Sequence, residues 1–231
     1  MDGVKKIGRK FYGDGANIWF PSLEELSISD FANLEEWSSA NDGNAFRRLK
    51  KLTVKSCPKL AHILLPQSLQ HLELRDCNPM TDLSLLSILI LDNIRDLVSL
   101  LEGLFASASL YFLKILSCPK LHSMPLHMQN LSSLKSLTIY WCEELSSLPK
   151  SLQNLKALES LEISDCYNLT SLPNCGIAGL VSLRTLSIEN CNEITSLLSS
   201  LKQLTLLEHL TIMYCPKLGF FPVGVQHLSS L

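Results

Sequence analysis

Residues 134–145 have the sequence LKSLTIYWCEEL, which recurs as LESLEISDCYNL at residues 158–169 and as LEHLTIMYCPKL at residues 207–218. The shared pattern is L-x-x-L-x-I-x-x-C-x-x-L. Positions 4 and 6 are apolar with a polar residue between them, and this period of two predicts a short strand. Positions 1, 9 and 12 are also apolar, so the chain is expected to turn inward again after the strand. One copy alone cannot bury this apolar edge, whereas stacked copies form a continuous core.

Nine units of this kind can be aligned along the chain. They begin at Leu23, Leu49, Leu69, Leu86, Leu110, Leu134, Leu158, Leu183 and Leu207. The spacing between starts is nearly constant from Leu86 onward but irregular before it, and it is shortest between Leu69 and Leu86. Two registers fit residues 85–97, and Ile88 and Ile90 are exposed on the concave face in only one of them.

The units predict two parts of the chain, an N-terminal lead-in at residues 1–22 and a repeat domain at residues 23–231. Leu231 follows Leu207 by one full repeat length and is therefore the first residue of a tenth copy. Because a solenoid normally closes with a polar cap, the last repeat is predicted to be incomplete or uncapped. We expect this C-terminal unit to fray or self-associate.

The second half of the units has a different rhythm. Residues 124–131, 148–155 and 221–228 each carry an apolar residue and a proline, followed by apolar residues at a spacing of three. Proline can open a helical turn, and this spacing suits a short 3₁₀ or α segment. The predicted fold class is therefore an α/β solenoid. It has a parallel β-sheet on the concave face and short helical turns or irregular loops on the convex face.

Seven of the eight cysteines occupy position 9 of the repeat, and only Cys175 lies elsewhere. They are Cys57, Cys77, Cys118, Cys142, Cys166, Cys191 and Cys215. Equivalent residues in stacked coils lie about 4.8 Å apart, which is the spacing of neighbouring strands. The seven thiols are therefore predicted to form a buried, reduced cysteine ladder rather than disulfides. Reduced cysteines favour a cytoplasmic or nuclear location.

Composition and charge exclude several classes of partner. The formal net charge is −2, so there is no basic surface for nucleic acid or for a membrane. The longest apolar stretch, residues 83–91, is less than half of the ~20 residues that a membrane-spanning helix needs. The first residues, MDGVKKIGRKFYGDG, lack the apolar run of a signal peptide.

No constellation of catalytic or metal-binding residues emerges from the repeats. His71 and His209 share position 3, but six units separate them by about 29 Å at strand spacing. The ladder cysteines lack the C-x-x-C spacing of zinc sites. Residues 3–10, GVKKIGRK, differ from a phosphate-binding loop because Arg9 stands where its lysine belongs. We therefore predict no enzyme activity, no catalytic residue, no metal and no cofactor.

The variable positions 3, 5, 7 and 8 are predicted to face outward on the concave side. The candidate partner-binding residues there are Lys51, Lys55, Arg75, Phe112, Lys114, Tyr140, Trp141, Glu162, Asp165, Glu189, Met213 and Tyr214. Their character changes from basic through aromatic to acidic along the array. Exposed aromatic residues are typical hot spots of interfaces. Two interpretations stay open for Tyr140 and Trp141, contact with a partner or packing on the neighbouring coil, and the charges also fit a solvated face without a specific partner.

Several motifs are more particular than the repeat itself. CPKL occurs at residues 57–60, 118–121 and 215–218, and FPSLEELSISDFANLEEW at residues 20–37. LPQSLQHLELRDC lies at residues 65–77, and SLP occurs twice, at residues 147–149 and 171–173. Together they resemble the leucine-rich-repeat region of plant intracellular nucleotide-binding disease-resistance proteins of the coiled-coil class. The resemblance covers residues 7–231.

The resemblance implies a leucine-rich-repeat horseshoe with a role in plant defense. Its partner would be a protein, either a pathogen effector, a host target or the nucleotide-binding domain of its own receptor. The family's GxxxxGK[ST] loop and helical signalling domain do not occur in this sequence, so it corresponds to the recognition part without the switch. A fragment, a truncated gene product and an isolated module all fit this expectation.

Two other binding proteins compete with this interpretation. A leucine-rich-repeat substrate-binding scaffold of a ubiquitin ligase, or another cytosolic adaptor, also has cysteines at this position. That ligase class needs a helical adaptor-binding segment, for which we expect the lead-in before Leu23 to be too short. A secreted or membrane-anchored ectodomain would have asparagine at position 9, cysteine-paired caps and a signal segment.

Overall fold

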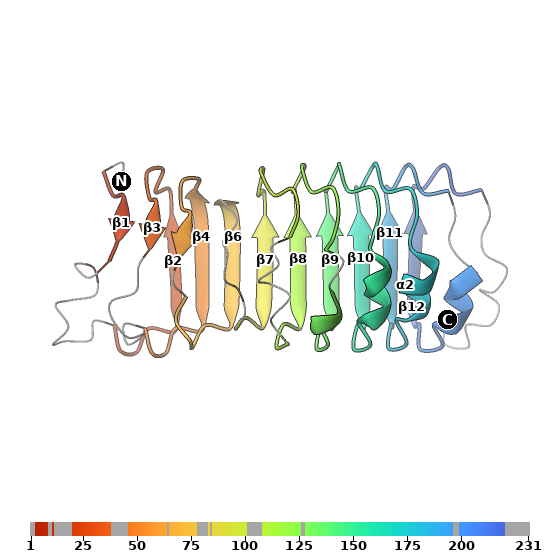
Figure 1. Ribbon diagram of the computed structural model, residues 1–231, viewed down its shortest axis with the longest axis horizontal. Coiled ribbons are helices and arrows are strands. Elements are labelled where there is room, and N and C mark those ends of the chain that lie inside the picture. Colours follow the sequence, from red (N-terminus) through yellow and green to blue (C-terminus); the bar gives the residue numbers. More distant parts are fainter. Residues whose placement is uncertain are drawn as a thin grey trace.

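The computed structural model describes residues 3–8, 11, 20–37, 46–63, 65–77, 83, 85–100, 108–125, 128–195 and 199–219. The chain winds in successive coils along one axis, and each coil adds one strand to a long sheet (Figure 1). The strand arrows point the same way, so their carboxyl ends share one edge of the sheet (Figure 1). Short helices lie on one face of this sheet, in the C-terminal half.

In the described part of the chain, the main sheet contains nine parallel strands in chain order. They are β2 (Glu25–Ser29), β4 (Lys51–Cys57), β6 (His71–Cys77), β7 (Ile88–Asp92), β8 (Phe112–Leu116), β9 (Ser136–Tyr140), β10 (Ser160–Ser164), β11 (Thr185–Glu189) and β12 (His209–Met213). Equivalent positions pair throughout. In the fourth unit Ile88 pairs with His71 on one side and Phe112 on the other. The alignment that begins at Leu86 is therefore confirmed, and the shifted register is wrong.

The core follows from the alternation within the strands. Positions 4 and 6 point inward, and Leu137 and Ile139 of β9 have no exposed surface. Burying a side chain of this size contributes about 1.5–3 kcal/mol relative to exposure. In β12, the last strand that the structure describes, Leu210 and Ile212 are only partly buried. Burial is therefore deepest in the middle coils and weaker at this end.

Each strand of the main sheet has a residue with a left-handed backbone at its carboxyl end, at position 8 of the repeat. The nine residues are Asp30, Ser56, Asp76, Asn93, Ser117, Trp141, Asp165, Asn190 and Tyr214, with φ between 51° and 62°. The conformation turns the position-8 amide toward the next coil, where Trp141 N donates to Ser164 O at 3.1 Å. Aspartate and asparagine tolerate this region, whereas it is costly for bulky side chains. Among the nine position-8 residues, Trp141 and Tyr214 are therefore the two with a strained backbone.

The return half of each coil carries small elements. A second parallel sheet joins β1 (Lys6–Ile7), β3 (Glu36–Trp37) and β5 (His62–Ile63), so residues 6–7 of the lead-in stack on the first repeat. Among the described residues, the helical segments are the 3₁₀ helices η3 (Met128–Asn130), η4 (Lys150–Asn154) and η5 (Ser199–Gln203) and the α-helix α2 (Asn174–Ala178). Pro149 and Pro173 directly precede η4 and α2. The predicted solenoid with short helical turns is confirmed, while the segment at residues 221–228 and Leu231 lie outside the described residues.

The close contact between α2 and η4 leads to a prediction about Gly179. A Cβ at Gly179 would lie 2.5 Å from the Cα of Gln153, a backbone atom that cannot move aside alone. We expect Gly179→Ala to lower the free energy of unfolding by about 1–3 kcal/mol, as overpacking does. Gly219→Ala is the control, because a Cβ there meets nothing within 4 Å. Urea unfolding measures both variants, and equal stabilities would contradict this packing.

Candidate functional site

The cysteine ladder lies inside the solenoid and is structural. Six of its members are buried, Cys215 is partly buried, and all eight cysteines of the chain are free. Each ladder thiol donates to the carbonyl oxygen two residues before it, as Cys77 does to Arg75 at 3.0 Å and Cys191 to Glu189 at 3.3 Å. A small, weak donor suits this place. The thiols therefore stabilise the strand ends rather than form a reactive site.

Burial also controls the reactivity of these thiols. It raises the pKa of Cys166 to about 11 and that of Cys191 to about 12, so few thiolates form near pH 8. We expect a thiol reagent such as Ellman's reagent at pH 8 to modify the exposed Cys175 first and Cys215 more slowly. The six buried ladder thiols should react only after denaturation. A hydrogen bond with the neighbouring ladder thiol lowers the pKa of Cys57 and of Cys118, but burial keeps the reagent away from both. Several fast-reacting thiols in the native protein would contradict the ladder.

The described residues contain no group of three or more histidine, cysteine, aspartate or glutamate side chains that could hold a metal ion. His71 and His209 lie in β6 and β12, at well-separated places in the sheet. Among the helices that the structure describes, none has the length and apolar character to cross a membrane.

The middle of the concave face carries an apolar strip, formed by Ile88 and Ile90 of β7 and Phe112 and Leu116 of β8. All four side chains are half-buried, on the face that positions 4 and 6 do not occupy. The two strands pair directly, with Ile88 beside Phe112. The strip therefore exposes apolar surface that the core does not use.

A polar network borders the apolar strip on the side of β9. The Lys114 ammonium lies 5.9 Å from the centre of the Tyr140 ring, and the Tyr140 hydroxyl donates to Glu162 Oε2 at 3.0 Å. Burial and the Glu162 carboxylate together raise the pKa of Tyr140 to about 12. Tyr140 thus packs and hydrogen-bonds within the face while its side chain stays half-buried. These contacts bring three of the predicted residues together.

The predicted gradient of charge is modified by ion pairs at its basic end. Lys55 Nζ lies 3.5 Å from Glu73 Oε1, and Arg75 Nε lies 3.4 Å from Asp92 Oδ2. Lys51 is half-buried in β4. Neighbouring units therefore compensate much of the positive charge. The opposing carboxylates could have been found in the sequence, because they occupy outward positions of adjacent units.

At the acidic end of the concave face, the carboxylates of Glu162 and Glu189 form hydrogen bonds rather than ion pairs with the described residues. Glu162 accepts hydrogen bonds from Tyr140 and, at 3.4 Å, from Ser160, while Glu189 accepts from Ser187 at 2.7 Å. In the described part of the chain neither carboxylate forms an ion pair. Some outward positions are not open, however, since Thr53, Thr138 and Ser164 are buried. The accessible part of this face is therefore apolar in its middle and acidic toward β11.

The position-8 residues lie at the rim of the sheet rather than on the concave face. Trp141 and Tyr214 are 57% and 71% exposed, and Met213 in β12 is also exposed. Most of the Trp141 side chain is thus not covered by the neighbouring coil. Asp165, by contrast, accepts hydrogen bonds from Tyr167 at 3.2 Å and from Asn190 at 3.0 Å. The predicted residues therefore divide into a concave group and a rim group.

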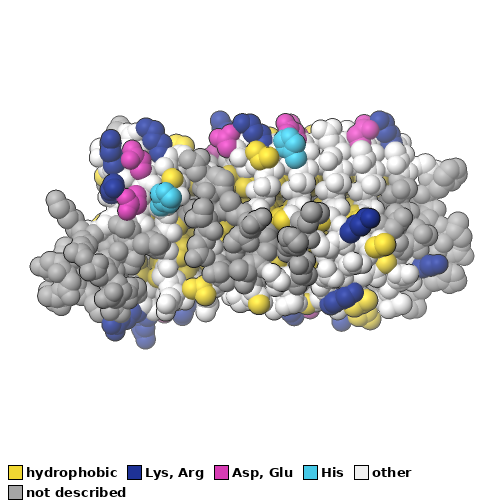
Figure 2. Space-filling view, in the orientation of Figure 1, with side chains coloured by type: hydrophobic (Ala, Val, Ile, Leu, Met, Phe, Trp, Pro, Cys, Tyr) yellow, Lys and Arg dark blue, Asp and Glu magenta, His cyan; other side chains and the backbone are white. Residues whose placement is uncertain are grey.

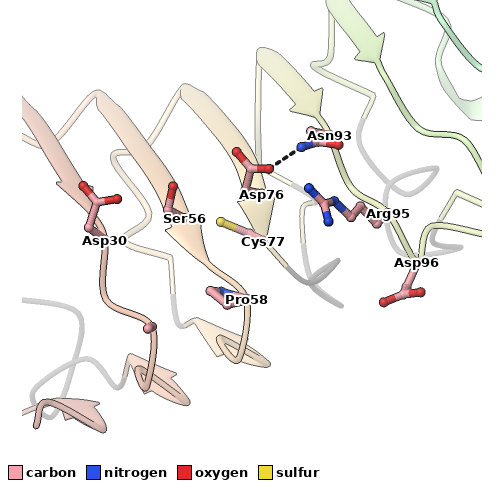
Figure 3. Close-up of a pocket in the computed structure, with 9 residues that line it drawn as sticks. Asp30, Ser56, Pro58, Asp76, Cys77, Asn93, Arg95 and Asp96 are labelled. Atoms are coloured by element: carbon pink, nitrogen blue, oxygen red, sulfur yellow. Dashed lines mark hydrogen bonds between the residues drawn. The ribbon is translucent and has the colours of Figure 1, made fainter. Parts of the chain in front are cut away.

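A groove runs along this rim, where the strands end. Its first part is a cavity of about 580 Å³, and the side chains of Asp30, Ser56, Asp76 and Asn93 project along it in a row (Figure 3). The other lining residues are Ala32, Pro58, Cys77, Arg95 and Asp96. Its second part, about 410 Å³, is lined by Asn93, Ser117, Pro119, Trp141, Glu143 and Tyr167. Asn93 belongs to both, so the two cavities adjoin, and together they are the edge groove.

Sequence reasoning missed the edge groove, because it treated position 8 as part of the concave face and did not consider position 10. The groove is lined by residues at both positions, such as Ser117 with Pro119 and Trp141 with Glu143. The sequence did carry a signal. Aspartate, asparagine or serine recurs at position 8, and such residues favour a left-handed turn. That turn separates the rim from the concave face.

Charged side chains gather along the edge at which the strands end (Figure 2). Several are ion pairs between successive coils, such as Lys120 with Asp96 at 2.7 Å and Lys217 with Glu193 at 2.7 Å. Each pair is largely exposed to water, and such a pair contributes little to stability. The carboxylates without such partners are the ones available to another molecule.

Comparison with known proteins identifies the architecture. No protein-family model matches the chain, and no curated protein is significantly similar in sequence. The leucine-rich-repeat domain of the type III effector XopL is 22% identical, with a TM-score of 0.71 over 91% of this chain and 75% of that chain. A leucine-rich-repeat protein of Leptospira interrogans is 21% identical, with a TM-score of 0.46 over 99% and 74% of the two chains. The fold of this chain is therefore a leucine-rich-repeat solenoid.

Proposed function

We propose that the chain is a protein-recognition module that binds its partner on the concave face. The apolar strip of β7 and β8 carries this proposal. Solenoids of stacked repeats offer extended concave surfaces for binding, and contiguous exposed apolar surface marks interaction sites. Ile90 and Phe112 are half-buried and provide partly exposed apolar surface of this kind, and Lys114 lies between the strip and Tyr140.

The cellular role that we propose follows from the sequence resemblance. The chain would serve as the recognition part of an intracellular plant immune receptor and bind a pathogen effector or a host protein. It would also be suited to restrain a nucleotide-binding switch domain. The CPKL motifs at residues 57–60, 118–121 and 215–218 support this role. An in-frame nucleotide-binding domain encoded upstream of the codon for Met1 would support it further, and a promoter and start site there would favour a separate adaptor instead.

The test of concave binding compares two aromatic residues that are adjacent in the chain. Phe112 belongs to the apolar strip, whereas Tyr111 precedes β8 and is exposed outside it. We expect Phe112→Asp to weaken binding of a purified partner at least tenfold, because a carboxylate in an apolar interface is desolvated without a partner. Tyr111→Asp should leave the affinity unchanged.

Circular dichroism and urea unfolding show whether both variants are folded, so that a loss of binding is not mistaken for a loss of structure. The partner is first isolated from a plant-cell extract on the wild-type chain, and its affinity for each variant is then measured by calorimetry. If a partner binds both variants equally well while both stay folded, the concave face is not its binding site and the proposal fails.

A further inference from the structure

We propose that the edge groove is a second recognition surface, which binds an extended protein segment containing arginine. This inference rests on the proposed role in protein recognition, but it places the contact at the strand ends instead of on the concave face. The groove extends from Asp30 in the first unit to Tyr167 in the seventh. At strand spacing, six steps between coils span about 29 Å, which matches roughly nine extended residues.

The shape of the groove follows from the left-handed turns at position 8. They bring Ser56, Asp76 and Asn93 to one line along the rim (Figure 3). Small and polar side chains at this position leave the space above the strand ends open, and the smaller of the two cavities still has about 410 Å³. A segment that runs across the coils meets one position-8 side chain per coil. An extended peptide advances by about 3.3 Å per residue, so it would place one or two residues on each coil along this path.

The lining charges select a basic occupant. Among the described residues, four carboxylates line the groove, those of Asp30, Asp76, Asp96 and Glu143, against one guanidinium, that of Arg95. Asp96 is paired with Lys120, and Asp76 accepts a hydrogen bond from Asn93 and lies 3.7 Å from Arg75 Nε. Asp30 and Glu143 form no ion pair within the described part of the chain, and each marks a different half of the groove. Their charge attracts a basic segment and repels nucleic acid or anionic lipid.

The aromatic end of the groove favours arginine over lysine. Trp141 and Tyr167 are 57% and 40% exposed, and both line the cavity that contains Glu143. A guanidinium stacks on an aromatic face and pairs with a carboxylate through its planar donors. Trp141 is also held in the left-handed region, at φ 52°, although the same position accepts serine or asparagine in other units. Strain at a site is typical where the side chain serves a function.

Fluorescence polarisation of labelled nonapeptide pools tests this inference on the full chain. The three pools have arginine, glutamine or glutamate fixed at both the second and the eighth residue, which lie near the two acidic ends of the groove, and alanine, leucine, serine or tyrosine elsewhere. We expect the arginine pool to bind at least tenfold more tightly than the glutamine pool, and the glutamate pool not to bind. Raising the salt concentration from about 50 to about 200 mM should weaken binding of the arginine pool, because the contact is partly electrostatic.

Variants locate the binding within the groove. Trp141→Asn and Trp141→Ser introduce residues that the repeat already has at position 8, in Asn93 and Ser117, so both are compatible with the fold. Either variant should bind the arginine pool at least fivefold more weakly than the wild type, and Asp30→Asn should bind it about threefold more weakly. Tyr111→Asn is the matched control for removal of an exposed aromatic residue and should have no effect.

Two outcomes overturn the inference. One is equal affinity for the arginine and glutamine pools, and the other is unchanged binding in both folded Trp141 variants. Phe112→Asp separates this result from the test of the concave face. If it abolishes partner binding but leaves the peptide pool bound, the two surfaces are independent. If the chain does not prefer the arginine pool while Phe112→Asp still weakens binding of the partner, only the edge groove is disproved as a binding site.

Discussion

Leu137→Ala should lower the free energy of unfolding by about 2–5 kcal/mol, the usual cost of removing a fully buried leucine side chain. Leu137 is at position 4 of β9, has no exposed surface and is stacked between Leu113 and Leu161. Its truncation leaves a cavity in the middle of the array. Because each coil contacts mainly its neighbours, the damage should weaken the junction between β8 and β10. Urea unfolding followed by circular dichroism measures the loss.

The matched variant is Leu210→Ala, at the same position of β12. Leu210 pairs with Leu186 on one side and is only partly buried, so its truncation removes less buried surface. We expect a loss of roughly half that of Leu137→Ala, in proportion to the area buried. Equal losses at the two sites would mean that the terminal coil is packed as tightly as the middle one, contrary to this structure.

Cys142→Asp should lower the free energy of unfolding about as much as Leu137→Ala does, by roughly 3 kcal/mol or more at neutral pH. The reason is that a carboxylate at the position of Cys142 would lose its hydration. The Cys142 side chain is completely buried and donates to the carbonyl of Tyr140 at 3.6 Å. The aspartate would face that same carbonyl oxygen, which cannot donate a hydrogen bond to it. Burial would raise the pKa of the aspartate in the folded state above its value of about 3.9 in the unfolded state.

The sign of the pH dependence follows from this difference. Protonation then favours the folded state, so the deficit of Cys142→Asp relative to the wild type should shrink as the pH falls from 7 toward 4. Cys142→Ser is the control, because it retains a small donor and does not titrate in this range. A deficit of Cys142→Asp that stays constant with pH would indicate that the carboxylate reaches water and that the ladder is not sealed.

The sequence predicted most of the fold because the repeat determines it locally. The apolar residues at positions 4 and 6 required strands, and the recurrence of Cys142 and its equivalents required one register. Periodicity could not decide the register near Ile88, because the unit before it is the shortest of the array and residues 88–91 are all apolar, without a polar residue between them. Pairing with His71 and Phe112 decides it. The register of this unit is therefore determined by pairing with the neighbouring strands and not by its local sequence pattern.

The candidate site was less predictable. Sequence alone identified the variable positions, but not how a left-handed turn divides them between the concave face and the rim. Nor could it show that Trp141 is exposed while Tyr140 is hydrogen-bonded to Glu162. These properties depend on which side chains of adjacent coils meet, and on the space between them. The edge groove follows from the same geometry.

Hydrogen exchange at β7 tests the central claim that one register continues through all nine units. The apolar strip and the edge groove both depend on it, since Ile88 and Ile90 form half of the strip and Asn93 joins the two cavities. We predict that the amides of Ile88–Asp92 exchange as slowly as those of Phe112–Leu116 and Ser136–Tyr140, because all three strands are paired on both sides. Fast exchange confined to Ile88–Asp92 would divide the sheet at the fourth unit and contradict a continuous recognition surface.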